Sequence, residues 1–359
     1  MNRRWVDLIC VGVLCVILVL GLWPFHSPEN SVTWLSYRNG LAFGKWATAI
    51  SSGAFPMASQ QSGSGTVEVW LQPRRRWDSS TILSFYTPGN PHPFSLRQSQ
   101  VDLELKAGNR LYAANVFRRS GPVFLTVTTG VHGTKIYANG NPLGVASQFR
   151  LPPNAFAGRL ILGDSPGQPD NWSGEMLGVA VYDSELPPAR VQRHCQTWTR
   201  GTQPAISADD RNVALYLFDE REGSVVHNHA GAGIDVDIPR RYHVLDKVFL
   251  EPFWKEFSFS RSYWDSAGKN IVGFLPFGFC FYSCLLLHGF RRAALATVIL
   301  GALVSLTIET MQAYLPTRDS GTTDIVTNTL GTWIGVLLYR PVASILSSVL
   351  FGGATSAHL

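Results

Sequence analysis

The sequence has few charged residues and few cysteines for its length. Asp, Glu, Lys and Arg make up only 15% of its 359 residues, and its mean hydropathy lies near zero. This combination is typical of a chain that mixes soluble and membrane segments, and the length allows two or three domains. Cys195 is the only cysteine between residues 16 and 279, so that long segment can form no internal disulfide.

Several functional signatures are also missing. No glycine-rich phosphate loop is present, and the strand-like segments show no catalytic triad. The excess of five positive charges is modest and the basic residues are scattered, which excludes a nucleic-acid-binding surface. The other cysteines, Cys10, Cys15, Cys280 and Cys284, fall in apolar runs, where we expect them to pack as small apolar residues and not to bind metal.

Four apolar runs predict membrane-spanning helices. The first, Trp5 to Trp23, follows two arginines and lacks an Ala-x-Ala cleavage site, which favours a retained anchor over a signal peptide. The others are Ile271 to Leu287, Ala293 to Leu315 and Ile325 to Tyr339. The last run is short for a span of about 20 residues, unless the helix continues through Pro341 to Leu350.

The basic residues predict the orientation of these spans. With four spans, the clusters Arg3–Arg4 and Arg291–Arg292 and the single Arg340 all fall on one side of the membrane. The positive-inside rule makes that side cytoplasmic, so we expect a multi-pass cell-membrane protein with both termini cytoplasmic. The long segment after the first span and the polar loop from Pro316 to Asp324 are then extracytoplasmic.

The segment between the first two spans reads as β structure. Thr66 to Leu71 and Val101 to Leu105 alternate apolar and polar residues, and Thr134 to Ala138 runs into Asn139-Gly140, a strong hairpin signal. Many short strands separated by Gly, Pro and Asn predict an antiparallel β-sandwich, such as a jelly roll. The predicted fold class is therefore mixed: a helical membrane bundle and an extracytoplasmic sandwich.

These patterns predict five regions. They are a cytoplasmic stub with the first helix (1–25), the sandwich (26–240), an aromatic interfacial linker (241–269), a membrane domain of three helices (270–351) and a tail (352–359).

Two groups in the sandwich carry side chains of the kinds that bind metals, and one of them is a calcium candidate. Asp164, Asp170 and Asn171 share one loop and offer oxygen atoms to calcium, although Asp and Asn also form ordinary turns. His227 and His229 flank Asn228, and we interpret them as surface histidines. We expect no cofactor beyond this calcium possibility.

The membrane segments carry a second candidate site. Glu309 and Gln312 share one helix face, and Asp324, Asn328, Gly331 and Gly335 form a stripe on the next helix. Gly331 and Gly335 allow a neighbouring helix to approach closely. Ionisable residues in membrane helices are costly and mark functional sites, so we predict ligand binding by a polar group near the outer leaflet. Its members are Asn270, Glu309, Gln312, Arg318, Asp324 and Asn328.

Alternatives remain for this group. In one, its polar residues serve only to hold helices together. In another, Glu309 acts as an acid or base, while Arg318 binds phosphate and Asp324 orients a group or holds a divalent ion. A pairing of Glu309 with Arg318 is also predicted.

Two family resemblances rest on these residues. The series Asn270, Gly273, Pro276, Glu309-x-x-Gln312, Arg318, Asp324 and Asn328 with its glycines resembles the VanZ-like family over about 270–339. The hairpin KIYANGNPLG, GRLILGDSP and the run WSGEMLGVAVYDSELPPARVQRH resemble laminin-G-like, concanavalin A-like domains over about 34–239. In such domains the segment resembling ALYLFDEREG opens the fold. Here it comes last, and we expect it to pair with Gly40–Phe43.

The resemblances imply a function class. The VanZ-like family is associated with glycopeptide antibiotic resistance, and concanavalin A-like domains bind glycans, proteins or calcium. We therefore expect a bacterial cell-envelope protein that binds a lipid-linked or peptidoglycan-related ligand, with a glycan- or protein-binding sandwich. A membrane enzyme using Glu309 and a membrane-anchored adhesion domain are the alternatives. The sequence does not indicate an oligomeric state.

Overall fold

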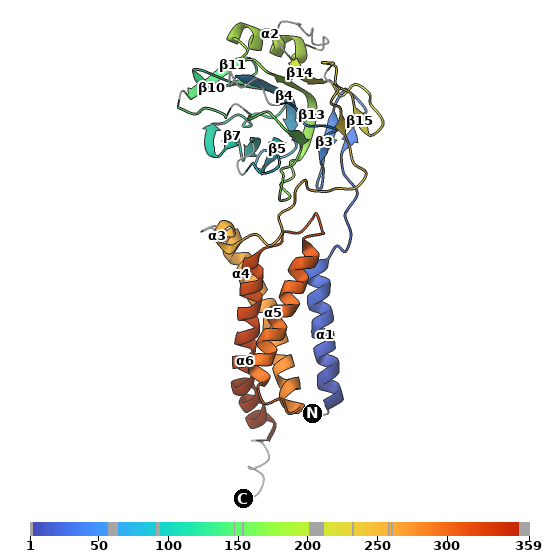
Figure 1. The fold of residues 1–359 in the computed structure, drawn as a ribbon, viewed down its shortest axis with the longest axis vertical. Helices are drawn as coiled ribbons and strands as arrows, with labels where there is room; N and C mark the ends of the chain where they lie inside the picture. Colours follow the sequence, from blue (N-terminus) through green and yellow to red (C-terminus); the bar gives the residue numbers. More distant parts are fainter. Residues whose placement is uncertain are drawn as a thin grey trace, which may run out of the picture. The chain divides into compact units, whose positions relative to one another are not determined.

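The computed structural model describes residues 3–56, 64–90, 94–146, 148–152, 154–200, 212–231, 233–257, 259 and 261–351. The chain divides into two compact units (Figure 1). Residues 27–247 form one, here called the β unit, and residues 1–26 together with 248–359 form the other, here called the helical unit. The predicted tail, 352–359, lies outside the described residues.

The β unit contains two antiparallel sheets. The first has the order β1-β2-β13-β4-β9-β10-β11, and β14 also pairs with β13. Its strands are β1 (Thr33–Trp34), β2 (Leu41–Phe43), β4 (Gly65–Pro73), β9 (Val123–Gly130), β10 (Gly133–Ala138), β11 (Asn141–Ala146), β13 (Gly174–Tyr182) and β14 (Asn212–Tyr216).

The second sheet has the order β15-β16-β3-β12-β5-β6-β7-β8. Its strands are β3 (Ala49–Ser51), β5 (Ser79–Tyr86), β6 (Ser95–Ser99), β7 (Asp102–Ala107), β8 (Asn109–Ala113), β12 (Arg159–Leu162), β15 (Val225–Val226) and β16 (Val236–Asp237). The two sheets make the β-sandwich that the alternating pattern predicts.

Alternation along the strands builds the core between the sheets. Leu103 and Leu105 on β7 are fully buried in the main apolar cluster, whereas Glu104 between them points to the opposite face. The outer face of the first sheet is covered by α2 (Pro188–Thr199), whose Val191, Cys195 and Trp198 are buried there. The lone thiol of the β unit is thus an apolar packing residue.

Local turn chemistry explains the hairpin between β10 and β11. Asn139 and Gly140 both have positive φ, 52° and 76°, as a two-residue hairpin turn requires. The predicted pairing of the last segment with Gly40–Phe43 is wrong as stated. The segment forms β14 and pairs with β13, and next to β2 the Gly40 N–H donates to the Phe218 carbonyl at 3.0 Å.

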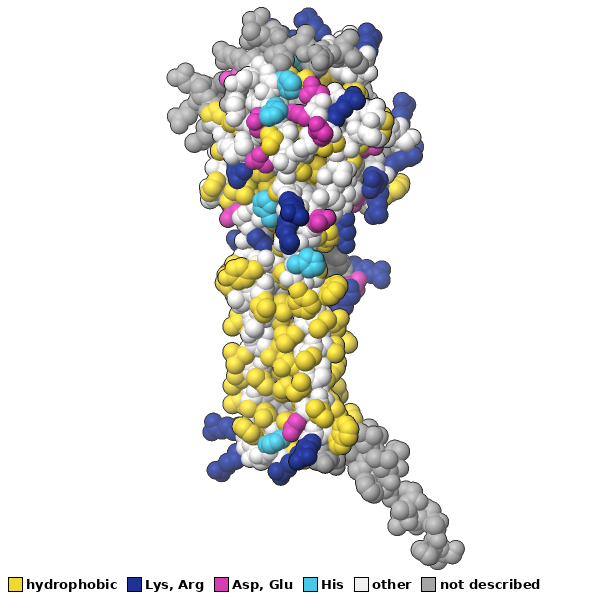
Figure 2. Space-filling view, turned by 90° about the vertical axis from the view of Figure 1, so that its right-hand side faces the viewer, with side chains coloured by type: hydrophobic (Ala, Val, Ile, Leu, Met, Phe, Trp, Pro, Cys, Tyr) yellow, Lys and Arg dark blue, Asp and Glu magenta, His cyan; other side chains and the backbone are white. Residues whose placement is uncertain are grey.

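The helical unit contains α1 (Arg3–Leu22), the short α3 (Phe253–Glu256), α4 (Arg261–Leu287), α5 (Ala293–Gln312) and α6 (Thr322–Phe351). Among the described residues, the segments Arg3–Leu22, Tyr263–Leu287 and Ala293–Gln312 are long and apolar enough to cross a membrane. Apolar side chains cover the visible face of these helices (Figure 2). The helix α4 begins ahead of its apolar run, inside the predicted linker, and α6 continues through Pro341.

Glycine lets α6 lie directly against α4. A Cβ atom added at Gly331 would lie 2.3 Å from the Ile271 carbonyl oxygen, and one at Gly335 would lie 2.3 Å from that of Leu275. Only a hydrogen at these positions allows the two backbones to approach this closely. The predicted role of the glycine pair is therefore seen in the structure, with α4 as the partner helix.

Candidate ligand site at the start of α6

The C-terminal end of α1 is held by residues of α5 and of the turn before α6. The last carbonyls of a helix have no partner within the helix. The Arg318 guanidinium donates to the carbonyls of Leu20 (3.2 Å) and Trp23 (2.5 and 3.0 Å), and the Gln312 amide donates to Gly21 (2.8 Å). A cation at this end is also favoured by the helix dipole. Arg318 and Gln312 therefore hold the C-terminal end of α1 by hydrogen bonds to its carbonyls.

Glu309 caps the start of α6 from the neighbouring helix. Its side chain is 1% exposed, and its Oε2 accepts a hydrogen bond from the Gly321 N–H at 2.9 Å. The Ser320 hydroxyl donates to the Glu309 carbonyl at 2.9 Å. A backbone N–H at a helix start suits a carboxylate, which explains how this acidic residue is accommodated between helices. The predicted pairing of Glu309 with Arg318 stays a prediction, since the hydrogen bonds of Arg318 described above go to α1.

A second carboxylate reaches the same helix start from α3. The Glu256 Oε2 accepts a hydrogen bond from the Thr323 N–H at 3.0 Å. The main chain of Glu251 also pairs with this turn, accepting from the Thr322 N–H at 2.9 Å and donating to the Ser320 carbonyl at 2.9 Å. The segment before α4 is thus tied to the start of α6, a contact that its aromatic composition alone did not indicate.

Asn270, Asp324 and Asn328 lie where α4, α5 and α6 meet. Asn270 donates to the Thr327 hydroxyl at 3.4 Å and lies within hydrogen-bonding reach of the Asp324 carboxylate. The Asn328 Nδ2 donates to the Ser305 hydroxyl on α5 at 2.9 Å. Ser305 is one helical turn from Glu309, so the structure brings the predicted residues of α4, α5 and α6 to one end of the helical unit.

One acceptor in this group has no partner among the described residues. The Oδ1 of Asn328 makes no hydrogen bond, although the residue is only 5% exposed. The hydroxyl of Thr323, a residue 9% exposed, likewise has no hydrogen-bond partner among the described residues. An unpaired buried polar group costs about 1–3 kcal/mol, so such groups usually meet water or a ligand.

The charges around the start of α6 are mainly negative. Glu256, Glu309 and Asp324 approach it, and the nearby Arg318 is engaged with the carbonyls of α1. This balance disfavours a phosphate and favours hydroxyl, amide or amine groups. Sequence reasoning missed Glu256, because nothing in the string Phe253 to Glu256 shows that it folds back onto a helix start far along the chain.

The predicted calcium loop of the β unit is closed by its own hydrogen bonds. Asp164 is 1% exposed; its Oδ1 accepts from the N–H groups of Ser165 (2.9 Å) and Asp170 (2.8 Å), and its Oδ2 from the Tyr242 hydroxyl (2.8 Å). Burial raises the pKa of Asp164 to about 7, against the opposing effect of these donors.

The other two candidates in this loop also have partners. The Asp170 carboxylate pairs with Arg97 and accepts from the Thr81 hydroxyl at 2.5 Å, and the Asn171 amide donates to the Ala47 carbonyl at 3.2 Å. A calcium ion at Asp170 would compete with a guanidinium. Calcium binding here stays a prediction.

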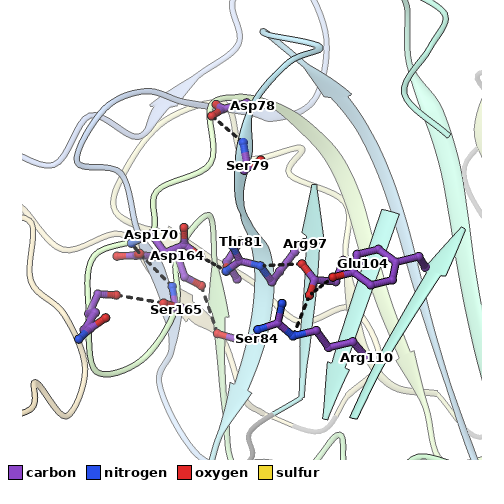
Figure 3. A network of polar contacts seen from close by, with 12 residues as sticks. Asp78, Ser79, Thr81, Ser84, Arg97, Glu104, Arg110, Asp164, Ser165 and Asp170 are labelled. Carbon is purple, nitrogen blue, oxygen red and sulfur yellow. Dashed lines mark hydrogen bonds and ion pairs between the residues drawn. The ribbon is translucent and has the colours of Figure 1, made fainter. Parts of the chain in front are cut away.

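A row of polar residues crosses the outer face of the second sheet (Figure 3). Thr81, Arg97, Glu104 and Tyr112 are direct partners on the successive strands β5, β6, β7 and β8. Glu104 lies 3.4 Å from both the Arg97 and the Arg110 Nε, and it accepts from the Tyr112 hydroxyl at 3.1 Å. Tyr112 is 51% exposed. The row joins an exposed aromatic ring to fixed hydrogen-bonding groups.

The histidines of the β unit pair with acids. The His227 Nδ1 lies 3.2 Å from Asp235 Oδ2, and the His229 Nε2 lies 3.2 Å from Asp219 Oδ1. Both histidines are at the surface, as predicted. Asp219, Glu220 and His229 also bring three ligand atoms within 4.8 Å of one another.

Comparison with known proteins identifies both halves of this architecture. Residues 222–346 match the VanZ/LLP1 family model, and residues 48–192 match the model of the concanavalin A-like lectin/glucanases superfamily. The chain carries a VanZ/LLP1 domain and a concanavalin A-like domain. The VanZ/LLP1 match begins inside the β unit, at a residue before β15, whereas the helices that carry its polar residues all belong to the helical unit.

Solved structures resemble the concanavalin A-like domain at low identity. A putative carbohydrate binding protein from Bacteroides ovatus is 15% identical, with a TM-score of 0.40, and the match covers 59% of this chain and 58% of that one. A heptameric SAP-like pentraxin from Limulus polyphemus is 17% identical, with a TM-score of 0.38 and coverage of 60% and 95%. Domain 4 of the arabinanase AbnA from Geobacillus stearothermophilus is 16% identical, with a TM-score of 0.37 and coverage of 47% and 86%. No curated protein matches the sequence.

Proposed function

We propose that this protein is a multi-pass protein of the bacterial cell envelope that binds a peptidoglycan-related or lipid-linked ligand at the start of α6. The unpaired, buried Oδ1 of Asn328 is the observation that carries the proposal. Asn270, Asp324 and Asn328 contact the ligand, while Glu309, Gln312 and Arg318 hold α1 and the turn before α6 around it. The resistance to glycopeptide antibiotics that the family resemblance implies belongs to this proposal.

The chemistry of the group favours the sugar or peptide part of such a ligand over its phosphate. Asp324 and the Asn270 amide offer hydrogen bonds to hydroxyl and amine groups, and the Asn328 Oδ1 needs a donor. Glu256 and Glu309 add negative charge around them. A disaccharide-peptide fragment of peptidoglycan is therefore the first probe to use.

Binding of that fragment by the purified full-length chain in detergent tests the proposal. The double substitution Asn328→Leu with Ser305→Ala removes both partners of one hydrogen bond, so we expect little change in stability. We expect at least a tenfold weaker affinity in native mass spectrometry. Thr329→Val, on the next residue, should bind like the wild type. Absence of binding to the wild type, or equal binding by the double variant, would refute the proposal.

The proposal includes an orientation, with the turn before α6 outside the cytoplasmic membrane. Ser320 is 4% exposed, so a label is better placed at the neighbouring exposed Asp319. In a cysteine-free background, a membrane-impermeant maleimide should label Asp319→Cys in intact spheroplasts. Arg292→Cys, at the exposed start of α5, should react only after lysis. The reverse pattern would overturn the orientation.

The β unit is proposed to bind glycan through the polar row on its second sheet. An exposed ring beside fixed charged groups suits a pyranose, which offers both an apolar face and hydroxyls. Tyr112→Ala and Arg110→Ala should weaken binding to insoluble peptidoglycan in a pull-down of the full chain. Trp77→Ala, an exposed aromatic outside the row, is the control. If both Tyr112→Ala and Arg110→Ala bound insoluble peptidoglycan as well as the wild type, the polar row would not be the glycan-binding surface.

A further inference from the structure

A cluster of thiol, imidazole and carboxylate groups lies where α1 begins and α4 ends. Asp7 comes from α1, and Cys284 and His288 come from the end of α4 and the turn after it. The Cys284 Sγ lies 3.3 Å from Asp7 Oδ1 and 3.7 Å from His288 Nδ1, and the His288 Nε2 lies 3.9 Å from Asp7 Oδ2. One ligand atom from each of these residues lies within 4.8 Å of the other two.

The hydrogen bonds of His288 determine which ring nitrogen faces Asp7. The His288 Nδ1 lies 2.9 Å from the Cys284 carbonyl oxygen, which can only accept, so Nδ1 carries a proton. In the neutral ring the lone pair of Nε2 is then directed toward the side of Asp7. A histidine whose other nitrogen donates to a carbonyl is the usual arrangement of a metal ligand.

The distances also suit a bound cation. At 3.9 Å, the His288 Nε2 and the Asp7 carboxylate are too far apart for a hydrogen bond. Ligands about 2.0–2.3 Å from zinc at tetrahedral angles lie about 3.3–3.8 Å from one another, so small side-chain movements would close the site. The three side chains are partly exposed, which allows an ion to enter.

Further thiols adjoin the cluster. Cys10, one helical turn after Asp7, is 4% exposed and lies within hydrogen-bonding reach of Cys284. Cys280 precedes Cys284 by one turn on α4 and lies near Cys10. Histidine and acidic side chains lie side by side at this end of the helices, where the apolar surface gives way to basic side chains (Figure 2).

We propose that Asp7, Cys284 and His288 bind a thiophilic divalent cation of the zinc class, with Cys10 as the fourth ligand. Sulfur, imidazole and carboxylate together are the ligand set that zinc accepts. Binding releases the thiol protons of Cys284 and Cys10 to the solvent and ties α1 to α4. The group of Asp219, Glu220 and His229 in the β unit is the weaker candidate, because it lacks sulfur and its histidine is already within hydrogen-bonding distance of Asp219.

Cobalt titration of the purified full chain in detergent tests the site. Co²⁺ replaces Zn²⁺ and gives a thiolate-to-metal charge-transfer absorption only when a cysteine binds it. We expect about one equivalent of Co²⁺ with this absorption, displaced by Zn²⁺. Cys284→Ser should remove about half of the absorption, because only the Cys10 thiolate is left, and combining it with Cys10→Ser should abolish the absorption. His288→Gln and Asp7→Asn should each weaken binding at least tenfold. Cys15→Ser, an exposed cysteine of α1, and His229→Gln should leave the spectrum unchanged.

Two outcomes would overturn the proposal. One is binding without thiolate absorption; the other is a wild-type spectrum retained in Cys284→Ser. Gel filtration would reveal a folding defect in Cys284→Ser. In that case, alkylation of the wild-type chain tests the site without any substitution. Zn²⁺ should protect Cys284 from alkylation by N-ethylmaleimide while Cys15 stays reactive, as identified by mass spectrometry. Equal reactivity of both cysteines with and without Zn²⁺ would contradict the site.

Discussion

At the scale of single residues, several polar groups of the helical unit serve the ends of helices. Glu309 and Glu256 accept from the first N–H groups of α6, and Arg318 donates to the last carbonyls of α1. These are the backbone groups that a helix cannot satisfy by itself. Asn328 differs, because half of its amide has no partner among the described residues. In the proposed function, this difference separates residues that position the site from the residue that would contact a ligand.

Substitution of Glu309 tests the capping role. Glu309→Gln keeps an acceptor for the Gly321 N–H and should change the free energy of unfolding by less than about 1 kcal/mol. Glu309→Ala leaves that buried N–H unpaired and should cost about 1–3 kcal/mol. Thermal unfolding in detergent measures both, with Thr310→Ala at the neighbouring, half-buried residue as control. Equal stability of Glu309→Ala and the wild type would contradict the cap.

Asp164 should make the stability of the β unit depend on pH. Burial raises its pKa from 3.8 to about 7, so the folded protein binds more protons than the unfolded chain between these values. The contribution of Asp164 to stability is therefore full below about pH 4 and is lost as the pH rises to about 7. At about 1.4 kcal/mol per pKa unit, the loss is on the order of 4 kcal/mol.

Calorimetry of the full chain at pH 4, 5.5 and 7 measures this dependence. The transition of the β unit should move to lower temperature as the pH rises. Asp164→Asn cannot ionise, so it should remove most of the dependence, whereas Asp102→Asn, in the second sheet, should leave it unchanged. A wild-type profile that rises over this pH range would contradict the sign of the effect.

At the scale of elements, close packing of α4 and α6 sets the geometry of the candidate site. Asn270 on α4 reaches Thr327 on α6 only because glycine holds the two backbones close together. The same approach places Asp324 and Asn328 beside α4 and α5. The glycines of α6 are therefore positioning residues for the polar group.

Alanine substitution tests this packing. At Gly331 or Gly335 the new Cβ would collide with a carbonyl of α4 at 2.3 Å, so the helices must separate. We expect each substitution to cost about 1–3 kcal/mol and to weaken fragment binding. Gly273→Ala on α4, which meets nothing within 4 Å, should change stability by less than about 0.5 kcal/mol. Equal melting temperatures for Gly331→Ala and Gly273→Ala would refute the close contact.

At the scale of the whole molecule, local patterns predict elements better than they predict partners. The Asn139-Gly140 turn and the spacing of Gly331 and Gly335 each have one favourable structure, and both are seen. The partners of Arg318, by contrast, are carbonyls at the far end of α1. The thiol cluster likewise depends on the register of α1 against α4, which no short segment of sequence specifies.

The start of α6 is proposed to bind an envelope ligand. Hydrogen–deuterium exchange of the full chain in detergent, with and without the disaccharide-peptide fragment, measures this binding at the site itself. We expect slower exchange on binding in peptides that cover residues 318–330. The protection should be absent in the variant that combines Asn328→Leu with Ser305→Ala. No protection in the wild type, or the same protection in the variant, would contradict the account.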